Sequence, residues 1–369
     1  MRFEIVGVDG PSMGESPTLM PFVKGLEEVL TAEGDEKAGG EGSGTKVVFN
    51  FFPPDRPRPH HRGSQATFVV GITAGPEPEG DILQAVYPMM IRSLGNHLIY
   101  LVEPIAGNGV PRATYFVTLE RGYYPLEDCA PEDYFHHVLD RVRPLAESRL
   151  VINNEFREDL PPGFWEGNER TQEIVIASRR MAEMDLLPAP FPMETLLPEK
   201  DFLHLKRLFQ IGGLSYGNVS VREPGYGFWM SASGVDKSRL EHVGRDILLV
   251  RDYDEAHNQI ILSVPPDISP RRRVSVDAIE HWMIYRRHPG VGAILHVHAW
   301  MEGVVSTEIN YPCGTYEIAR AVSDALATVD DPVHGVIGLR NHGLTITGEK
   351  LPEIFDRVGP HLLRQVPMS

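Results

Sequence analysis

The chain has 369 residues, of which 42% are hydrophobic and 23% are charged, so it has an ordinary globular composition and the length of about two domains. Its net charge of −16 at pH 7 argues against a general nucleic-acid binder, because such a protein needs basic surface to bind phosphate. The sequence also has no run of ~20 apolar residues for a membrane span, no signal peptide and only two cysteines, which predicts a cytoplasmic protein without a disulfide framework.

The first half of the chain alternates strand-like and helical segments. A helical pattern over residues 22–30 runs into the glycine cluster Gly39–Gly44, which we interpret as a turn, because a dinucleotide-binding loop would follow a strand instead. Further on, the predicted order is strand, helix, strand, strand, helix, strand, as in the split βαβ arrangement of ferredoxin-like domains. These segments are Ala66–Thr73, Asp81–Leu94, His97–Val102, Thr114–Leu119, Pro131–Ser148 and Leu150–Asn153. Residues 1–160 are therefore predicted to form a separate α+β domain of unknown role.

Residues 161–199 are predicted to be a proline-rich linker with one helix at about 171–184. From residue 200 to residue 369, short strands alternate with helices, which predicts a second domain of the α/β class. Its expected strands are Val219–Arg222, Phe228–Ser231, Ile247–Val250, Ile260–Ser263, Val291–Trp300, Val336–Leu339 and Leu344–Thr347. Its expected helices are Phe202–Gln210, Ser275–Arg287, Tyr316–Thr328 and Leu351–Leu363.

Two histidines, His296 and His298, occupy alternate positions in an apolar strand-like run. Side chains at positions i and i+2 of a strand lie on the same face, so both imidazoles can reach one metal ion. The alternative is that one faces solvent and the other is a hydrogen-bonded core histidine. A third histidine, His342, lies beside Gly343 in a predicted tight turn between two strands. Three such imidazoles would leave a coordination position open, as catalytic zinc sites do.

Asp277 lies at the start of the helix that precedes the His-x-His strand. With Ser275 as the N-cap, Asp277 would stabilise the first turn through the helix dipole and need have no other role. The functional alternative makes Asp277 a fourth metal ligand or a general base. His281 follows one turn later on the same face and could orient it.

Five pieces of the second half occur in one order and together resemble the class II aldolase/adducin family. They are Asn-Val-Ser-Val-Arg, Ser-Ala-Ser-Gly, Ser-Val-Asp before a helix, His-Pro-Gly-Val-Gly-Ala-Ile-Leu-His-Val-His, and Asn-His-Gly-Leu. The resemblance covers roughly residues 200–357, whereas the first half of the chain shows none. It implies an α/β/α sandwich around a mostly antiparallel sheet, and a homo-oligomer, commonly a tetramer.

The resemblance also implies a metal-dependent lyase. It places a divalent metal, usually Zn²⁺ with Mn²⁺, Co²⁺, Ni²⁺ or Fe²⁺ as alternatives, on His296, His298 and His342. A carbon–carbon bond of a small hydroxylated carbonyl or oxo-acid would break through a metal-stabilised enediolate, with Asp277 as the base. The positions that match the family's substrate-binding residues are Gly217, Asn218, Ser233, Gly234 and Ser275.

Two departures from the family pattern bear on the substrate and the base. Asp277 stands where these aldolases have a glutamate, and Val276 replaces a serine of a phosphate-binding pair, which favours a carboxylate over a phosphate. The run Arg271–Arg273 could bind either anion or be a solvated loop. Some dehydratase relatives place an acid/base on the next helix, where Tyr316 and Glu317 stand, and a solvated helix residue is the alternative for Glu317.

Two classes of function remain open from the sequence. The first is an enzyme that performs aldol cleavage, decarboxylation, dehydration or epimerisation, since spacing does not separate these reactions. The second is an adducin-like scaffold that kept the fold and lost catalysis. The presence of all three histidines favours the enzyme, because a scaffold has no need of three convergent imidazoles.

Overall fold

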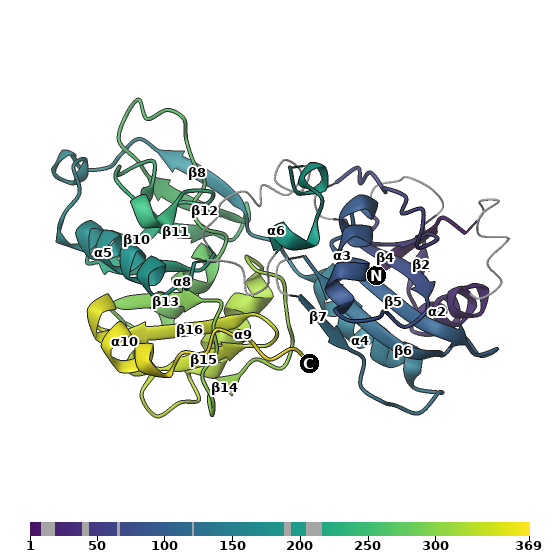
Figure 1. Ribbon diagram of the computed structural model, residues 1–369. Helices are drawn as coiled ribbons and strands as arrows, with labels where there is room; N and C mark the ends of the chain where they lie inside the picture. Colours follow the sequence, from purple (N-terminus) through teal and green to yellow (C-terminus); the bar gives the residue numbers. More distant parts are fainter. Residues whose placement is uncertain (9–18, 39–43, 65–66, 120–121, 188–192, 204–215) are drawn as a thin grey trace. The chain divides into compact units, whose positions relative to one another are not determined.

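The structure is a computed structural model, and it describes residues 1–8, 19–38, 44–64, 67–119, 122–187, 193–203 and 216–369. The chain divides into two compact units (Figure 1). Unit 1 contains residues 1–147, 191–206 and 368–369, and unit 2 contains residues 148–190 and 207–367. Most of the expected helix Phe202–Gln210, from residue 204 on, and most of the glycine cluster at 39–44 lie outside the described residues.

Unit 1 is an α+β domain built on a seven-stranded sheet of order β2-β1-β3-β4-β5-β6-β7. Its strands are β1 (Arg2–Val6), β2 (Glu36–Lys37), β3 (Val47–Phe51), β4 (Phe68–Gly75), β5 (His97–Ile105), β6 (Pro111–Thr118) and β7 (Gly122–Pro125). Its helices are α2 (Met20–Ala32), α3 (Ile82–Ser93), α4 (Tyr134–Glu147) and the short α6 (Met193–Leu196).

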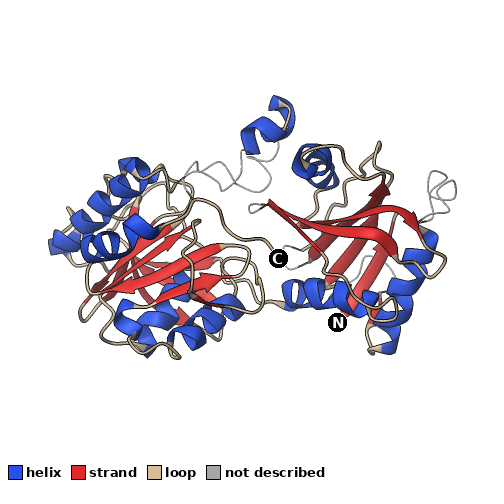
Figure 2. Cartoon of the chain, turned by 60° about the horizontal axis from the view of Figure 1, so that its bottom comes forward, coloured by secondary structure: helices blue, strands red, loops and turns tan. Residues whose placement is uncertain are grey.

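The expectation of a separate α+β domain is confirmed, but the ferredoxin-like strand order is wrong. Strands β1 to β5 pair in parallel, and only β6 and β7 add antiparallel pairs at one edge. Parallel strands need helices on both faces of their sheet, and helices cover both faces here (Figure 2). In agreement with this, all five residues of β3 are buried. A ferredoxin-like sheet would have left one face uncovered by helices.

Unit 2 contains a nine-stranded sheet of order β14-β15-β16-β13-β9-β10-β11-β12-β8. Neighbouring strands are antiparallel except for the pair at each edge, β14–β15 and β12–β8, so the expected mostly antiparallel sheet is confirmed. The strands are β8 (Asn153–Arg157), β9 (Asn218–Glu223), β10 (Gly227–Ser231), β11 (Ile247–Asp254), β12 (Gln259–Ser263), β13 (Ala293–Val297), β14 (Val305–Ser306), β15 (Val336–Leu339) and β16 (Gly343–Gly348).

Helices lie on both faces of the unit 2 sheet and make it an α/β/α sandwich (Figure 2). They are α5 (Glu169–Glu183), α8 (Ala278–Arg287), α9 (Tyr316–Leu326) and α10 (Leu351–Val358). Helices α5 and α10 share one face, and α8 and α9 share the other. The single large core of the unit runs between these layers and includes Trp229, Ile294 and Ile346.

The segment before residue 200 differs from the expected linker. Strand β8 pairs in parallel with β12, and α5 packs on β9 and β10, so both are parts of unit 2. Helix α5 begins with a well-formed cap, since the Asn168 side chain accepts hydrogen bonds from the backbone N–H groups of Arg170 and Thr171. Its buried Ile174 and Met181 contribute to the core of the sandwich. No helix among the described residues is long and apolar enough to cross a membrane.

Candidate metal centre and active site

His296 lies in the interior strand β13 and His298 directly follows its last residue, with only 1% and 6% of their surfaces exposed. In the antiparallel ladder His296 is opposite Asn218 of β9 and Thr345 of β16, so these three side chains lie on one face of the sheet. That face carries α8. The alternative in which one of the two histidines faces solvent is therefore wrong for this structure.

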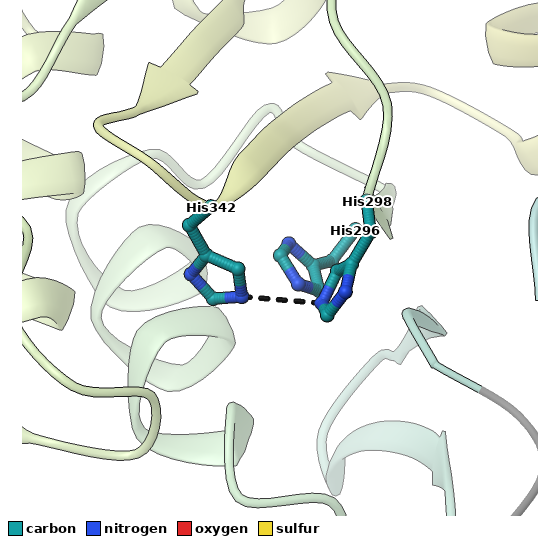
Figure 3. A group of neighbouring side chains, drawn as sticks. All are labelled: His296, His298 and His342. Carbon is teal, nitrogen blue, oxygen red and sulfur yellow. Dashed lines mark hydrogen bonds between the residues drawn. The ribbon is translucent and has the colours of Figure 1, made fainter. Parts of the chain in front are cut away.

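His342 reaches the same place from the turn between β15 and β16. Asn341 takes the left-handed conformation with φ of 56°, and a Cβ on Gly343 would lie 2.2 Å from the carbonyl oxygen of Val297. Only glycine permits this approach, which lays the turn against the end of β13. His342 is consequently 2% exposed and faces the other two histidines (Figure 3).

The three imidazoles converge tightly. One ligand nitrogen from each lies within 4.8 Å of the other two, and the Nε2 atoms of His298 and His342 are 3.2 Å apart. Two nitrogen ligands of a tetrahedral zinc ion, each at ~2.0–2.1 Å, would be about 3.3 Å apart. The Nδ1–H of His296 donates to the carbonyl oxygen of Leu344 over 3.1 Å, which turns its Nε2 toward the cluster. The arrangement fits a metal site.

Asp277 is the N-cap residue of α8 and is 7% exposed, but its side chain makes no capping hydrogen bond. Its Oδ2 instead accepts a hydrogen bond of 2.6 Å from Nδ2 of Asn218. The N-cap is thus two residues later than the expected Ser275. The hydroxyl of Ser275 accepts a hydrogen bond of 3.1 Å from the same Asn218 amide. Asn218, rather than His281, orients the carboxylate.

The other expected substrate-binding residues lie in two turns, one before β9 and one after β10. Gly217 has φ of +69°, and a Cβ there would lie 2.5 Å from the carbonyl oxygen of His296, so the turn before β9 requires glycine. Ser233 and Gly234 form the turn after β10, where the backbone N–H of Ser233 donates to the carbonyl oxygen of Arg273 over 2.8 Å. This contact places the turn beside the strand-like segment that leads to Ser275.

Lys237 is a candidate residue that the sequence reasoning missed. It follows the Ser233–Gly234 turn and is 6% exposed, and burial lowers the pKa of its ammonium to about 8, while the charge of Asp277 opposes this shift. Of the neighbouring arginines, Arg271 forms an ion pair with Glu158, and Arg272 donates to the carbonyl oxygen of Gly234 over 3.2 Å. Lys237 is therefore a buried positive charge that interacts with Asp277.

Glu317 makes a different set of contacts from the other candidates. Its Oε2 accepts a hydrogen bond of 2.7 Å from the backbone N–H of Arg149. The Arg149 guanidinium stacks on the ring of Tyr316, 4.1 Å from its centroid. Both residues thus fasten the start of α9 to the segment before β8, and no described contact joins them to the histidines.

Comparison with known proteins supplies a family for the second half of the chain. Residues 204–309 match the profile of the Class II Aldolase and Adducin N-terminal domain. The C-terminal half contains a class II aldolase/adducin domain. The matched segment of this aldolase/adducin domain includes Asn218, Asp277, His296 and His298, and it ends before His342.

Solved structures that are similar to this chain share little sequence with it. L-fuculose-1-phosphate aldolase from Thermus thermophilus is 22% identical, with a TM-score of 0.32, over 50% of this chain and 85% of that one. An aldolase II superfamily protein from Pseudomonas syringae is 16% identical, with a TM-score of 0.35, over 55% and 75%. The N-terminal class II aldolase domain of a conserved protein from Thermoplasma acidophilum is 16% identical, with a TM-score of 0.33, over 55% and 93%. No curated protein matches the chain.

The aldolase/adducin domain also buries polar side chains between α8 and the sheet, among which the sequence pointed to His281 but not to Glu280. Glu280 is 1% exposed and accepts a hydrogen bond from the hydroxyl of Thr345. One residue later, Nδ1 of His281 lies 2.7 Å from the hydroxyl of Ser220. Burial lowers the pKa of His281 well below its ordinary value, and the nearby His296 adds to this effect, so His281 is neutral.

Glu280 predicts a pH dependence of stability in the metal-free protein. Burial, assisted by the charge of Asp277, raises its pKa from the ordinary 4.5 to about 8. Between pH 4.5 and about 8, Glu280 is protonated in the folded protein and ionised in the unfolded chain. Its contribution to the free energy of unfolding is therefore fully present below pH 4.5 and is lost as pH rises toward 8. The free energy of unfolding should therefore fall as pH rises through this range, by roughly 1 kcal/mol per pH unit.

The measurement compares urea unfolding of the wild type and Glu280→Gln at several pH values between 5 and 8, with a chelator present. The glutamine amide keeps an oxygen that can accept from Thr345, so the difference between the two curves isolates the ionisation. We expect the variant to gain stability relative to the wild type as pH rises. Parallel curves would show that Glu280 ionises normally in the folded protein.

Proposed function

We propose that the aldolase/adducin domain is a divalent-metal-dependent lyase that cleaves carbon–carbon bonds in small hydroxylated carbonyl or oxo-acid compounds. The observation that carries this proposal is the convergence of three buried imidazoles beside a carboxylate held by an amide, Asp277 on Asn218. Structural histidines rarely need such burial together, because each buried imidazole loses its hydration. Binding of a metal ion and a substrate would offset this loss of hydration.

His296, His298 and His342 would hold the metal. Their nitrogen donors suit Zn²⁺ and its transition-metal neighbours better than Mg²⁺ or Ca²⁺, which prefer oxygen ligands. When bound, such an ion supplies Lewis-acid polarisation of a substrate carbonyl. Three protein ligands leave room for the substrate, which structural zinc sites with four ligands do not.

Asp277 would act as the general base. The Asn218 amide holds one oxygen of its carboxylate at the amino end of α8. The surrounding burial excludes bulk water, so a proton taken from the substrate hydroxyl stays in the site.

The substrate's anionic or hydroxylated end would lie toward Ser233, Gly234 and Ser275. Lys237 adds one buried positive charge to this side. One positive charge balances a carboxylate but only half of the charge of a phosphate dianion. With a pKa of about 8, the ammonium is mostly charged at neutral pH. The homo-oligomer implied by the family remains part of this proposal.

Other functions fit the same geometry less specifically. Decarboxylation, dehydration or epimerisation would use the same metal and base, whereas the contact of Glu317 with the Arg149 backbone gives it a structural role at the start of α9. An adducin-like scaffold would need none of the three histidines. Retention of Asp277, Asn218 and the convergent imidazoles in one contact network favours the enzyme.

The deciding experiment has two stages. Purified protein, metal-depleted and then dialysed against Zn²⁺, Mn²⁺, Co²⁺, Ni²⁺ or Fe²⁺, should retain about one ion per chain. The loaded protein is then tested on paired aldols and 2-oxo acids, with and without a terminal phosphate, for metal-dependent release of a carbonyl product. Stoichiometric metal with turnover supports the lyase, whereas absence of bound metal under replete conditions would leave the scaffold as the better proposal.

A further inference from the structure

Cys313 lies beside the three-histidine cluster, although nothing in the sequence motifs points to it. It occupies the turn between β14 and α9 and is partly buried. Its Sγ is 3.3 Å from Nε2 of His342 and 3.9 Å from Nδ1 of the same ring. The nearer nitrogen is the one that lies 3.2 Å from Nε2 of His298, so the thiol lies beside the ring, closer to the nitrogen at which the cluster converges.

The backbone around Cys313 holds the thiol in this place. The hydroxyl of Thr315 donates to the carbonyl oxygen of Pro312 over 2.8 Å, and the backbone N–H of Val151 donates to the carbonyl oxygen of Gly314 over 2.7 Å. Gly314 has φ of +72°, and a Cβ there would lie 2.9 Å from Cβ of Val276. The turn is therefore clamped on both sides of the cysteine and packed against the residue that precedes Asp277.

The sulfur–nitrogen distance is close to that of two ligands of one ion. A thiolate at ~2.3 Å and an imidazole at ~2.0–2.1 Å from a tetrahedral zinc ion would be about 3.6 Å apart. The observed 3.3 Å is also short enough for an S–H···N hydrogen bond, so geometry alone leaves both uses available. Cys313 does not belong to the group whose donor atoms all lie within 4.8 Å of one another, so it stands at the margin of the site.

We propose that Cys313 Sγ is a fourth, displaceable protein ligand of the metal held by His296, His298 and His342. This proposal rests on the metal site of the proposed function. Without substrate, Cys313 would complete the coordination sphere as a thiolate. A substrate that offers two oxygens would displace the sulfur and occupy its position. A set of three imidazoles and one thiolate also favours Zn²⁺ and Co²⁺ over Mn²⁺, because sulfur is a soft ligand.

The test uses Co²⁺, which reports thiolate coordination by an intense near-ultraviolet charge-transfer absorption. The full chain is loaded with one equivalent of Co²⁺ and compared with Cys313→Ser and with Cys129→Ser, which removes the chain's other cysteine, in unit 1. We expect the absorption in the wild type and in Cys129→Ser, and its loss in Cys313→Ser. Added glycolate, a two-oxygen hydroxy-acid probe, should weaken the absorption in the first two.

Alkylation gives a second measurement that does not depend on how the serine variant folds. Bound Zn²⁺ should slow modification of Cys313 by iodoacetamide at least tenfold and leave Cys129 unaffected. If Co²⁺ binds stoichiometrically without the absorption and Zn²⁺ gives no protection, Cys313 is only a hydrogen-bond partner of His342, and the metal site stands without it. If the absorption persists in glycolate, the thiolate is a permanent ligand. If neither metal binds the wild type, the metal site and this proposal both fail.

Discussion

Changing His342 to Ala is expected to abolish stoichiometric metal binding, and so are the corresponding changes at His296 and His298. The three nitrogens form one group within 4.8 Å, so removing any member leaves two imidazoles to hold the ion. Loss of a residue that merely orients a ligand weakens metal affinity by about 10–100-fold, and loss of a ligand itself should exceed that range. Metal content after gel filtration, together with titration of a competing chelator, measures the effect.

His257→Ala is the matched control for these variants. His257 is exposed, pairs with Asp254 in the turn between β11 and β12, and has no part in the cluster. Its metal content should equal that of the wild type, which separates a local effect from a general effect of losing a histidine. Full metal content in all three cluster variants would contradict the assignment.

The parts of the site that the sequence predicted depend on local rules. His296 and His298 share a face because alternation along a strand has a period of two, and Gly343 marks a turn because only glycine tolerates the close approach to Val297. The order of the family motifs then placed Asn218 and Asp277 near them. Each inference needed only neighbouring residues or a known sequence pattern.

The parts that the sequence did not predict depend on long-range packing. Strand β8 looks like the last strand of the first domain, yet its partner is β12, more than 100 residues further along the chain. The parallel order of β1, β3 and β4 likewise depends on helices covering both faces of the sheet. A hydrophobic pattern shows that a strand is buried but does not show which strand pairs with it.

The missed site residues have the same explanation. Glu280 and Lys237 look like solvated charges in a one-dimensional pattern, since charged residues are seldom fully buried. One signal was present: Glu280 follows Asp277 by three residues, so both lie on the face of α8 that meets the sheet. Cys313 had no such signal, because its place depends on a turn clamped by Val151 and Pro312.

Asp277→Asn is expected to lower turnover by about 10²–10⁴-fold while leaving the fold intact. The substitution keeps an oxygen that can accept the hydrogen bond from Asn218 and removes the group that can take up a proton. Because the Asp277 side chain makes no capping hydrogen bond to α8, its replacement should not cost the ~1 kcal/mol that loss of a cap usually costs. Turnover per folded molecule, bound metal and thermal unfolding are measured on the same sample.

Asp81→Ala provides the opposite control, because Asp81 does cap a helix. Its carboxylate accepts a hydrogen bond of 3.0 Å from the backbone N–H of Leu83 at the start of α3 in unit 1. That variant should lose about 0.5–2 kcal/mol of stability and keep its turnover per folded molecule. If Asp277→Asn instead behaved like Asp81→Ala, losing stability with turnover unchanged, the carboxylate would be a structural group at the helix end. Retained metal with lost turnover is the result that identifies Asp277 as the base, because it separates proton transfer from metal binding.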